Sequence, residues 1–123
     1  MIGNLMNYSI KENIGANGIT LQDGQKVYDE IHPQLKHGQE VILDFADVRI
    51  VASPFLNAAV GQLLRDISAE DLNRYLKFTN LPPVKRPILK RVIDNAKEYY
   101  GNEQIRHAVD ATISEEAGSN DGD

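Results

Sequence analysis

The chain has 123 residues, which is enough for one domain with a hydrophobic core and too few for two. It has no cysteine, which excludes disulfide bonds and thiolate metal sites. The net charge is −5, but four negative charges lie near the end, on Glu115, Glu116, Asp121 and Asp123, so the nearly neutral remainder is not expected to bind nucleic acid.

Neither a secretory leader nor a membrane span is predicted. The first residues, MIGNLMNYSI, lack a basic start followed by a long apolar stretch. No apolar run approaches the length that crosses a bilayer. We therefore expect a cytoplasmic protein that does not bind a membrane.

The first predicted elements are a strand and a turn. Residues 6–11 alternate loosely between apolar and polar side chains, as an outer strand does. Residues 15–18 (GANG) form a cluster of turn-forming residues. We therefore expect a strand at one edge of the fold, followed by a turn.

A helix is predicted from about Leu21. Thr20 has the spacing of a capping residue, and apolar residues recur every four positions from Val27 onward. Pro33 pushes the residue before it away from helical geometry, so we expect an end or a kink there. Gly38 should close the element.

Residues 41–64 (VILDFADVRIVASPFLNAAVGQLL) are the most informative segment. The continuous apolar run at its start predicts a central strand, over residues 41–45, that is covered on both faces. Ser53 is a favoured N-cap residue, and Pro54 suits the first helical position. A serine hydroxyl displayed at a helix start beside a sheet is also well placed to hold a phosphate.

Two helices, a short helical turn that starts at Ser68, and one strand are predicted in the second half. Residues 54–66 carry an apolar stripe, and small residues within it allow a neighbouring backbone to approach closely. Residues 75–80 alternate and are rich in aromatic side chains, which predicts a strand. A third helix is expected over residues 84–100 and should stop at Gly101, and residues 104–113 fit either a short helix or a final strand.

The alternation of strands and helices predicts an α/β fold, with a mixed β-sheet of about four strands and helices packed on it. The sheet is expected to be mixed because its first strand pair can be antiparallel. One domain should span residues 1–113. Residues 114–123 are acidic, contain almost no apolar side chain, and should form a disordered tail.

Five cationic residues gather in the third predicted helix. On a helix such residues usually line a solvated face, and the alternative is a basic surface that meets an acidic partner. The residues are Lys85, Arg86, Lys90, Arg91 and Lys97.

Motifs for catalysis and for cofactor binding are mostly missing. The sequence has no glycine-rich phosphate loop, and its three histidines lack metal-ligand spacing, so no cofactor or metal site is predicted. Ser53 is not part of a G-x-S-x-G motif. Asp44 and Asp47 lie where a strand meets a turn, and turn chemistry explains them better than a paired-carboxylate site does.

Two motifs resemble a known family. Residues 44–48 (DFADV) and 52–61 (ASPFLNAAVG) resemble a bacterial group of STAS-like domains of unknown function, which is similar to the anti-sigma factor antagonists. The likeness continues through residues 78–81 and 92–100 and covers most of residues 6–101. It implies a STAS-like fold.

The resemblance also implies a function for one serine. In anti-sigma factor antagonists, a histidine-kinase-like ATPase phosphorylates a serine that follows the central strand and starts the next helix. Ser53 stands at that place and is the candidate phosphorylation site. Its neighbours depart from the family's usual pattern, because Ala52 replaces an Asp, and Pro54 and Phe55 replace a small residue and a Gly.

The leading interpretation is a non-enzymatic regulatory domain that binds a protein partner, which the resemblance suggests to be a histidine-kinase-like ATPase. The predicted partner-binding residues are Asp44, Asp47, Ser53, Pro54, Phe55 and Asn57. One alternative is a small hydrolase-type enzyme that uses Ser53 or Asp44. Another is a structural subunit that assembles as a homo-oligomer without any switch.

Overall fold

The strands form two small parallel sheets. The computed structural model describes the backbone of residues 5–113 and the side chains of residues 5–101. In the three-stranded sheet, β3 (Val41–Asp44) lies between β1 (Met6–Ser9) and β5 (Leu76–Thr79). The two-stranded sheet pairs β2 (Asn17–Gly18) with β4 (Ile50–Val51).

This architecture confirms an α/β fold and corrects the expected sheet. Every strand pair in the described chain is parallel, so the prediction of one mixed sheet of about four strands is wrong. Residues 15–18, predicted as a turn, include β2. A two-residue strand that contains a glycine shows no alternation, and only its pairing with β4 reveals it.

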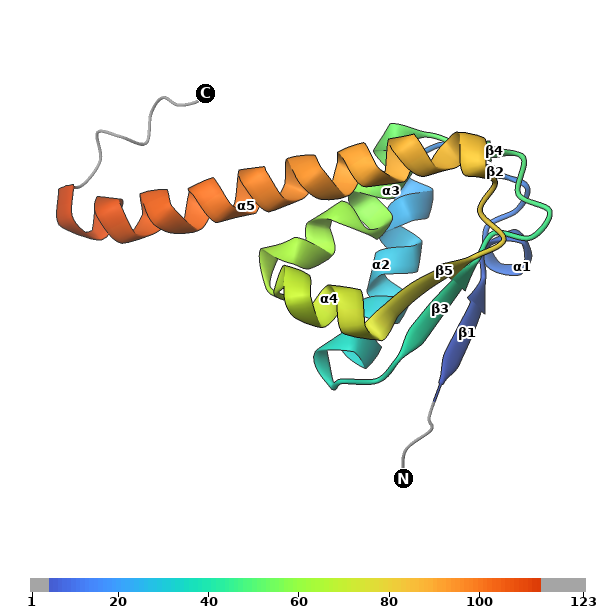
Figure 1. Ribbon diagram of the computed structural model, residues 1–123, viewed down its shortest axis with the longest axis horizontal. Helices are drawn as coiled ribbons and strands as arrows, with labels where there is room; N and C mark the ends of the chain where they lie inside the picture. The colour runs from blue at the N-terminus through green and yellow to red at the C-terminus, as the bar shows by residue number, and fades with distance from the viewer. Residues whose placement is uncertain (1–4, 114–123) are drawn as a thin grey trace.

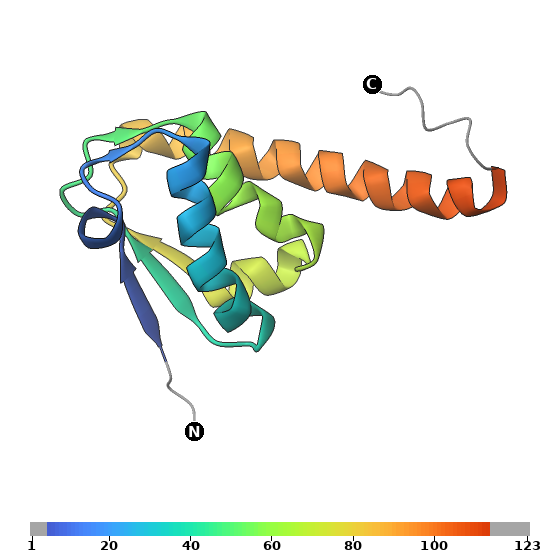
Figure 2. The same cartoon turned by 180° about the vertical axis from the view of Figure 1, so that it is seen from behind.

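Except for the short helix that follows β1, the helices gather on one side of the three-stranded sheet (Figures 1 and 2). The inner face of the sheet carries buried Val41 and Leu43, whereas the outer face carries half-buried Ile42 and exposed Lys77. The prediction that both faces of the central strand are covered is therefore wrong. The described helices are α1 (Ile10–Asn13), α2 (Leu21–Lys36), α3 (Ser53–Ala59), α4 (Ala69–Tyr75) and α5 (Arg86–Ile113), with short 3₁₀ segments η1 (Gly61–Arg65) and η2 (Pro83–Lys85).

The helix α2 begins as predicted and runs further. The Thr20 hydroxyl accepts a hydrogen bond from the backbone N–H of Asp23 at 3.1 Å, which confirms the cap. The helix continues through Pro33 to Lys36, so the predicted end at Pro33 is wrong. Gly38 follows with a φ of 78°, a left-handed conformation that suits glycine at the end of a helix.

The predicted helix over residues 54–66 is divided. Its apolar stripe is buried as expected, but α3 ends at Ala59 and η1 follows it. The predicted close approach is confirmed at Gly24 of α2, where an added Cβ would lie 2.3 Å from the carbonyl oxygen of Phe55 and 2.8 Å from Cβ of Ala58. The helices α2 and α3 therefore touch backbone to backbone.

The last helix is longer than predicted. Helix α5 continues through Gly101 to Ile113, so the expected stop at Gly101 is wrong and residues 104–113 are helical. An added Cβ on Gly101 would meet no atom within 4 Å, so no close contact requires a glycine there. The predicted tail, residues 114–123, lies outside the described residues.

Candidate interaction surface around Ser53

The candidate surface forms where β4 leads into α3. The backbone N–H of Ala52 donates to the carbonyl oxygen of Gly18 at 2.8 Å, so the start of α3 lies beside the segment that joins β2 to α2. The Phe55 side chain is fully buried, and its ring packs so close to Gly18 that an added Cβ would lie 3.0 Å away. These contacts fix the first turn of α3.

Ser53 is the first residue of α3 and does not cap it. The N-cap is Ala52, which has extended backbone angles and offers no side-chain hydrogen bond. The predicted cap at Ser53 is wrong because the chain enters the helix one residue earlier, which puts Pro54 at the second helical position. Ser53 is exposed, and its hydroxyl has no hydrogen-bond partner within residues 5–101.

The other predicted partner-binding residues separate into exposed and buried ones. Asp47, Pro54 and Asn57 are exposed. Asp47 lies in the turn after β3 with a φ of 64°, a conformation that Asp tolerates better than most residues. Phe55 is buried in the core, so its prediction as a contact residue is wrong.

Asp44 has a structural role at the ends of two strands. Its Oδ1 atom accepts a hydrogen bond from Nδ2 of Asn80 at 2.8 Å and another from the backbone N–H of Ala46 at 3.0 Å. These bonds, the one from Asn80 first, hold the pKa of Asp44 below its usual value. The carboxylate therefore joins the end of β3 to the residue that follows β5, as turn chemistry predicts.

Sequence reasoning missed three apolar residues beside Ser53. Ile19, Leu21 and Ile50 are 43%, 57% and 43% exposed. Ile19 follows Gly18, which bonds to Ala52, and Ile50 precedes Val51 in β4. No pattern along the chain marks these residues as exposed, because their exposure depends on the short β2–β4 pairing.

Helices α2 and α3 begin at the same end of the molecule, as the contact between Gly24 and Phe55 near their first turns requires. Figure 2 shows the first turns of α2 and α3 at the same end of the molecule. Leu21 and Ser53 are the first residues of these helices and therefore lie at that end. We call Ile19, Leu21, Ile50, Ser53 and Pro54 the Ser53 surface.

The two histidines whose side chains are described, His32 and His37, contact groups other than Ser53. Nε2 of His32 lies 3.0 and 3.1 Å from the carboxylate oxygens of Asp66, and Nδ1 of His37 lies 2.7 Å from the carbonyl oxygen of Pro33. At the rise of an α-helix, His32 is about 12 Å further along α2 than Gly24, away from the start of α3. Neither histidine is therefore placed to act as a base for Ser53.

The described residues contain neither a cluster suited to a metal ion nor a helix suited to span a membrane. No group of three His, Asp or Glu side chains among them is arranged to hold a metal ion. None of the helices in that part of the chain is both long and apolar enough to cross a bilayer.

Comparison with known proteins identifies the family. Residues 23–85 match the family described as a STAS-like domain of unknown function. No curated protein and no solved structure matches the chain significantly. The match covers most of α2, the central strand β3, the Ser53 surface from Ile50 onward, and β5. The chain belongs to the family of STAS-like domains of unknown function.

Proposed function

We propose that this domain is a non-enzymatic, cytoplasmic regulatory module that binds a protein partner through the Ser53 surface. The observation that carries the proposal is the exposure of three large aliphatic side chains, Ile19, Leu21 and Ile50, around an exposed serine. Exposed apolar residues that gather at one place favour an interaction site. Asp47, in the turn after β3, and Asn57, one turn into α3, are exposed polar residues.

The finer proposal concerns the partner and the switch. The family resemblance suggests a histidine-kinase-like ATPase that phosphorylates Ser53. Two features support it: the Ser53 side chain is exposed, and no described residue bonds to its hydroxyl. Phosphorylation would add a charge of about −2 to a largely aliphatic surface. A partner that binds the unmodified surface would then have to desolvate that charge, so modification should release it.

Two alternatives are weaker on physical grounds. A hydrolase that used Ser53 would need a base, and both described histidines bond to other groups. Asp44 is also a poor candidate, because hydrogen bonds to Asn80 and Ala46 already occupy its Oδ1 atom. A homo-oligomeric subunit would use the same aliphatic residues, and a measurement of mass against concentration distinguishes that case.

Photo-crosslinking tests the partner surface. A benzophenone amino acid is placed at Leu21 or at the control position Leu5, which is 49% exposed and precedes β1, at the opposite end of the sheet. Both full-length variants are expressed in the native cell. A discrete protein adduct is expected from position 21 alone. No adduct, or the same adduct from both positions, would contradict the proposal.

Phosphorylation is tested separately on protein isolated from the same cells. We expect mass spectrometry to find a phosphoryl group on the peptide that contains Ser53, and the Ser53→Asp variant to lose the crosslinked partner. A partner that crosslinks equally to wild type and Ser53→Asp would reject the switch and leave the interaction surface in place.

A further inference from the structure

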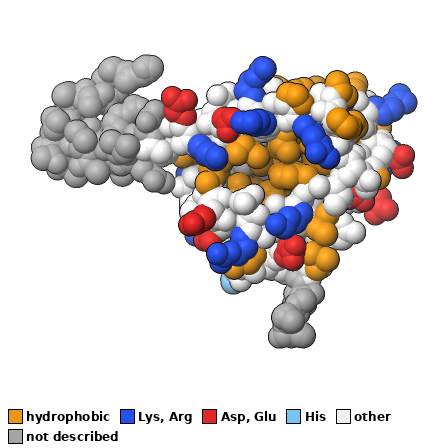
Figure 3. Space-filling view, viewed as in Figure 1, with side chains coloured by type: hydrophobic (Ala, Val, Ile, Leu, Met, Phe, Trp, Pro, Cys, Tyr) orange, Lys and Arg blue, Asp and Glu red, His pale blue; other side chains and the backbone are white. Residues whose placement is uncertain are grey.

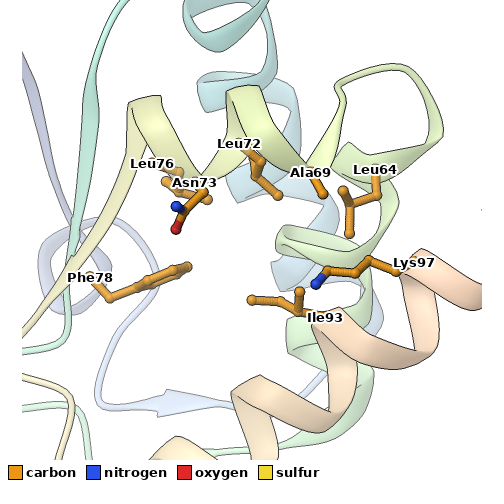
Figure 4. Close-up of a pocket in the computed structure, with 8 residues that line it drawn as sticks. All are labelled: Leu64, Ala69, Leu72, Asn73, Leu76, Phe78, Ile93 and Lys97. Carbon is orange, nitrogen blue, oxygen red and sulfur yellow. The ribbon is translucent and has the colours of Figure 1, made fainter.

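A second surface lies between α4, β5 and α5, where a hollow has a floor of apolar side chains (Figure 4). Leu72 of α4, Phe78 of β5 and Ile93 of α5 point into it from elements that are distant in sequence. Its volume is about 150 Å³, and a cavity of this size accepts a group as large as benzene.

The hollow continues along α5 in both directions. Toward the start of α5 it extends past Leu89 and keeps Phe78 and Ile93 in its wall. Toward the later turns it extends past Tyr100 and keeps Leu64 in its wall. The openings thus form one apolar groove, which we call the β5 groove and define by Leu64, Leu72, Leu76, Phe78, Leu89 and Ile93.

One wall of the groove is a strand with an unpaired edge. Within the described residues β5 pairs only with β3, so its other edge has no neighbouring strand. The carbonyl oxygen of Thr79 accepts a bond from the N–H of Phe45, so Thr79 and Lys77 direct their backbone groups toward β3. By the same alternation, the N–H and C=O of Phe78 point to the free edge.

The groove is also bordered by positive charge. Figure 3 shows Lys and Arg side chains around an apolar hollow. Arg86 and Lys97 line the groove, and neither forms a salt bridge with a described residue. The acidic residues in the lining already have partners, because Asp94 pairs with Lys90 and Asp66 pairs with side chains of α2.

We propose that the β5 groove binds an extended segment of a partner protein in which apolar and acidic residues alternate, as a fourth strand on the free edge of β5. Backbone groups of the added strand would pair with those of Phe78. Its apolar side chains would face the hollow. The alternate side chains would lie on the other face of the added strand, beside exposed Lys77, which favours carboxylates there. Arg86 and Lys97 add to the positive charge around the groove.

Two other occupants fit less well. The acidic end of this chain, residues 114–123, has only Ala117 as an apolar side chain and would leave the hollow unfilled. A second copy of the chain would bring the same cationic residues against Arg86 and Lys97. Charge and shape together therefore favour a partner segment.

A synthetic peptide tests the proposal with the full chain. The probe is a fluorescent, blocked peptide of about eight residues, the length of a typical strand, in which Glu alternates with Val or Ile. Fluorescence anisotropy should show binding that weakens as sodium chloride screens the charges. Two further versions of the peptide carry N-methyl groups on every second backbone amide, one on the odd-numbered and the other on the even-numbered positions. Only one pattern should abolish binding, because the N–H groups of a strand point alternately to its two sides.

Charge-reversal variants locate the site. Lys77→Glu should weaken peptide binding about tenfold, whereas Lys11→Glu, an equal change of charge on α1 beside the far strand β1, should leave it unchanged. Ile50→Glu should also leave it unchanged, so this proposal and the proposed function can fail independently. Absence of binding at about 1 mM peptide would overturn the proposal. So would equal losses with both methylation patterns, or equal effects of Lys77→Glu and Lys11→Glu.

The peptide-binding assay also tests the two other occupants, the acidic end of this chain and a second copy of it. Replacement of the four tail carboxylates by amides (E115Q, E116Q, D121N and D123N) in the full chain should leave peptide affinity unchanged. A stronger affinity would show that the tail occupies the groove and would overturn the proposal. Sedimentation should give the monomer mass of 13.7 kDa, and a dimer that the peptide dissociates would equally overturn it.

Discussion

Replacement of Gly24 by alanine tests the packing that positions the Ser53 surface. The added Cβ would lie 2.3 Å from the carbonyl oxygen of Phe55, 2.8 Å from Cβ of Ala58 and 3.1 Å from the backbone nitrogen of Ala59. Two of these three atoms belong to the backbone of α3, so a side-chain rotation cannot relieve the overlap. Helices α2 and α3 would have to separate.

The expected cost follows from two opposing terms. Overpacking of a core typically costs about 1–3 kcal/mol, and contact with backbone atoms at this distance belongs at the upper end or above it. Alanine recovers about 1 kcal/mol through its higher helix propensity. The free energy of unfolding of Gly24→Ala should therefore fall by about 2 kcal/mol or more. Gly101→Ala is the matched control, because its Cβ would meet no atom within 4 Å and the variant should gain about 0.5–1 kcal/mol.

Urea and thermal unfolding of the two variants measure these changes. For a domain of this length, 1 kcal/mol corresponds to about 4 °C in Tm, so Gly24→Ala should lower Tm by about 8 °C and Gly101→Ala should raise it slightly. The reasoning is refuted if both substitutions change the free energy of unfolding by the same amount, because α2 and α3 would then not touch at Gly24.

Four further substitutions give measurable outcomes in the same unfolding assays. Leu43→Ala, which empties a fully buried position, should cost about 2–5 kcal/mol, and a loss below half a kilocalorie would place β3 outside the core. Thr20→Ala should cost about 1 kcal/mol through loss of its cap, whereas Ser53→Ala should change stability by less than about 0.5 kcal/mol, because Ser53 caps nothing. Asn80→Gly keeps the positive φ of that residue, removes its bond to Asp44, and should cost about 1 kcal/mol at pH 7. The bond lowers the pKa of Asp44 in the folded state. Its contribution to the free energy of unfolding is therefore complete above the pKa of Asp44 in the unfolded state, about 4, and is lost as the pH falls through the lower pKa of the folded state. The stabilities of wild type and Asn80→Gly should converge as the pH falls below about 4.

The sequence predicted the elements whose signals are local and repeated. The apolar run at the start of β3 identified the central strand, and the spacing of apolar residues in α2 and in α5 identified buried helix faces. The cap at Thr20 was also predictable, because a hydroxyl and its helix start are separated by a fixed spacing.

Features that depend on distant contacts were not predictable. The strand β2 exists because Asn17 and Gly18 pair with β4, more than 30 residues away. The helix α2 passes Pro33 while its last apolar residue, Leu35, is buried in the core. These tertiary contacts override the local preferences that predicted a turn and a helix end.

The position of Ser53 in the fold was predictable, but the detail of its helix start was not. The segment that contains Ser53 was identified by its position after the central strand. The loss of the expected cap follows from a shift of one residue at the helix start, a precision that sequence patterns do not reach. The aliphatic residues Ile19, Leu21 and Ile50 became part of the surface only when the β2–β4 pairing was known.

The central claim is that the partner binds the Ser53 surface. It is tested most directly by measuring the dissociation constant of the crosslinked partner for full-length variants that carry a new charge. Ile50→Glu places a charge within the Ser53 surface and should weaken binding about tenfold or more. Leu5→Glu makes the same kind of change at an exposed apolar residue at the other end of the sheet and should leave the dissociation constant unchanged. Equal dissociation constants for wild type, Ile50→Glu and Leu5→Glu would contradict the assignment of the partner to the Ser53 surface.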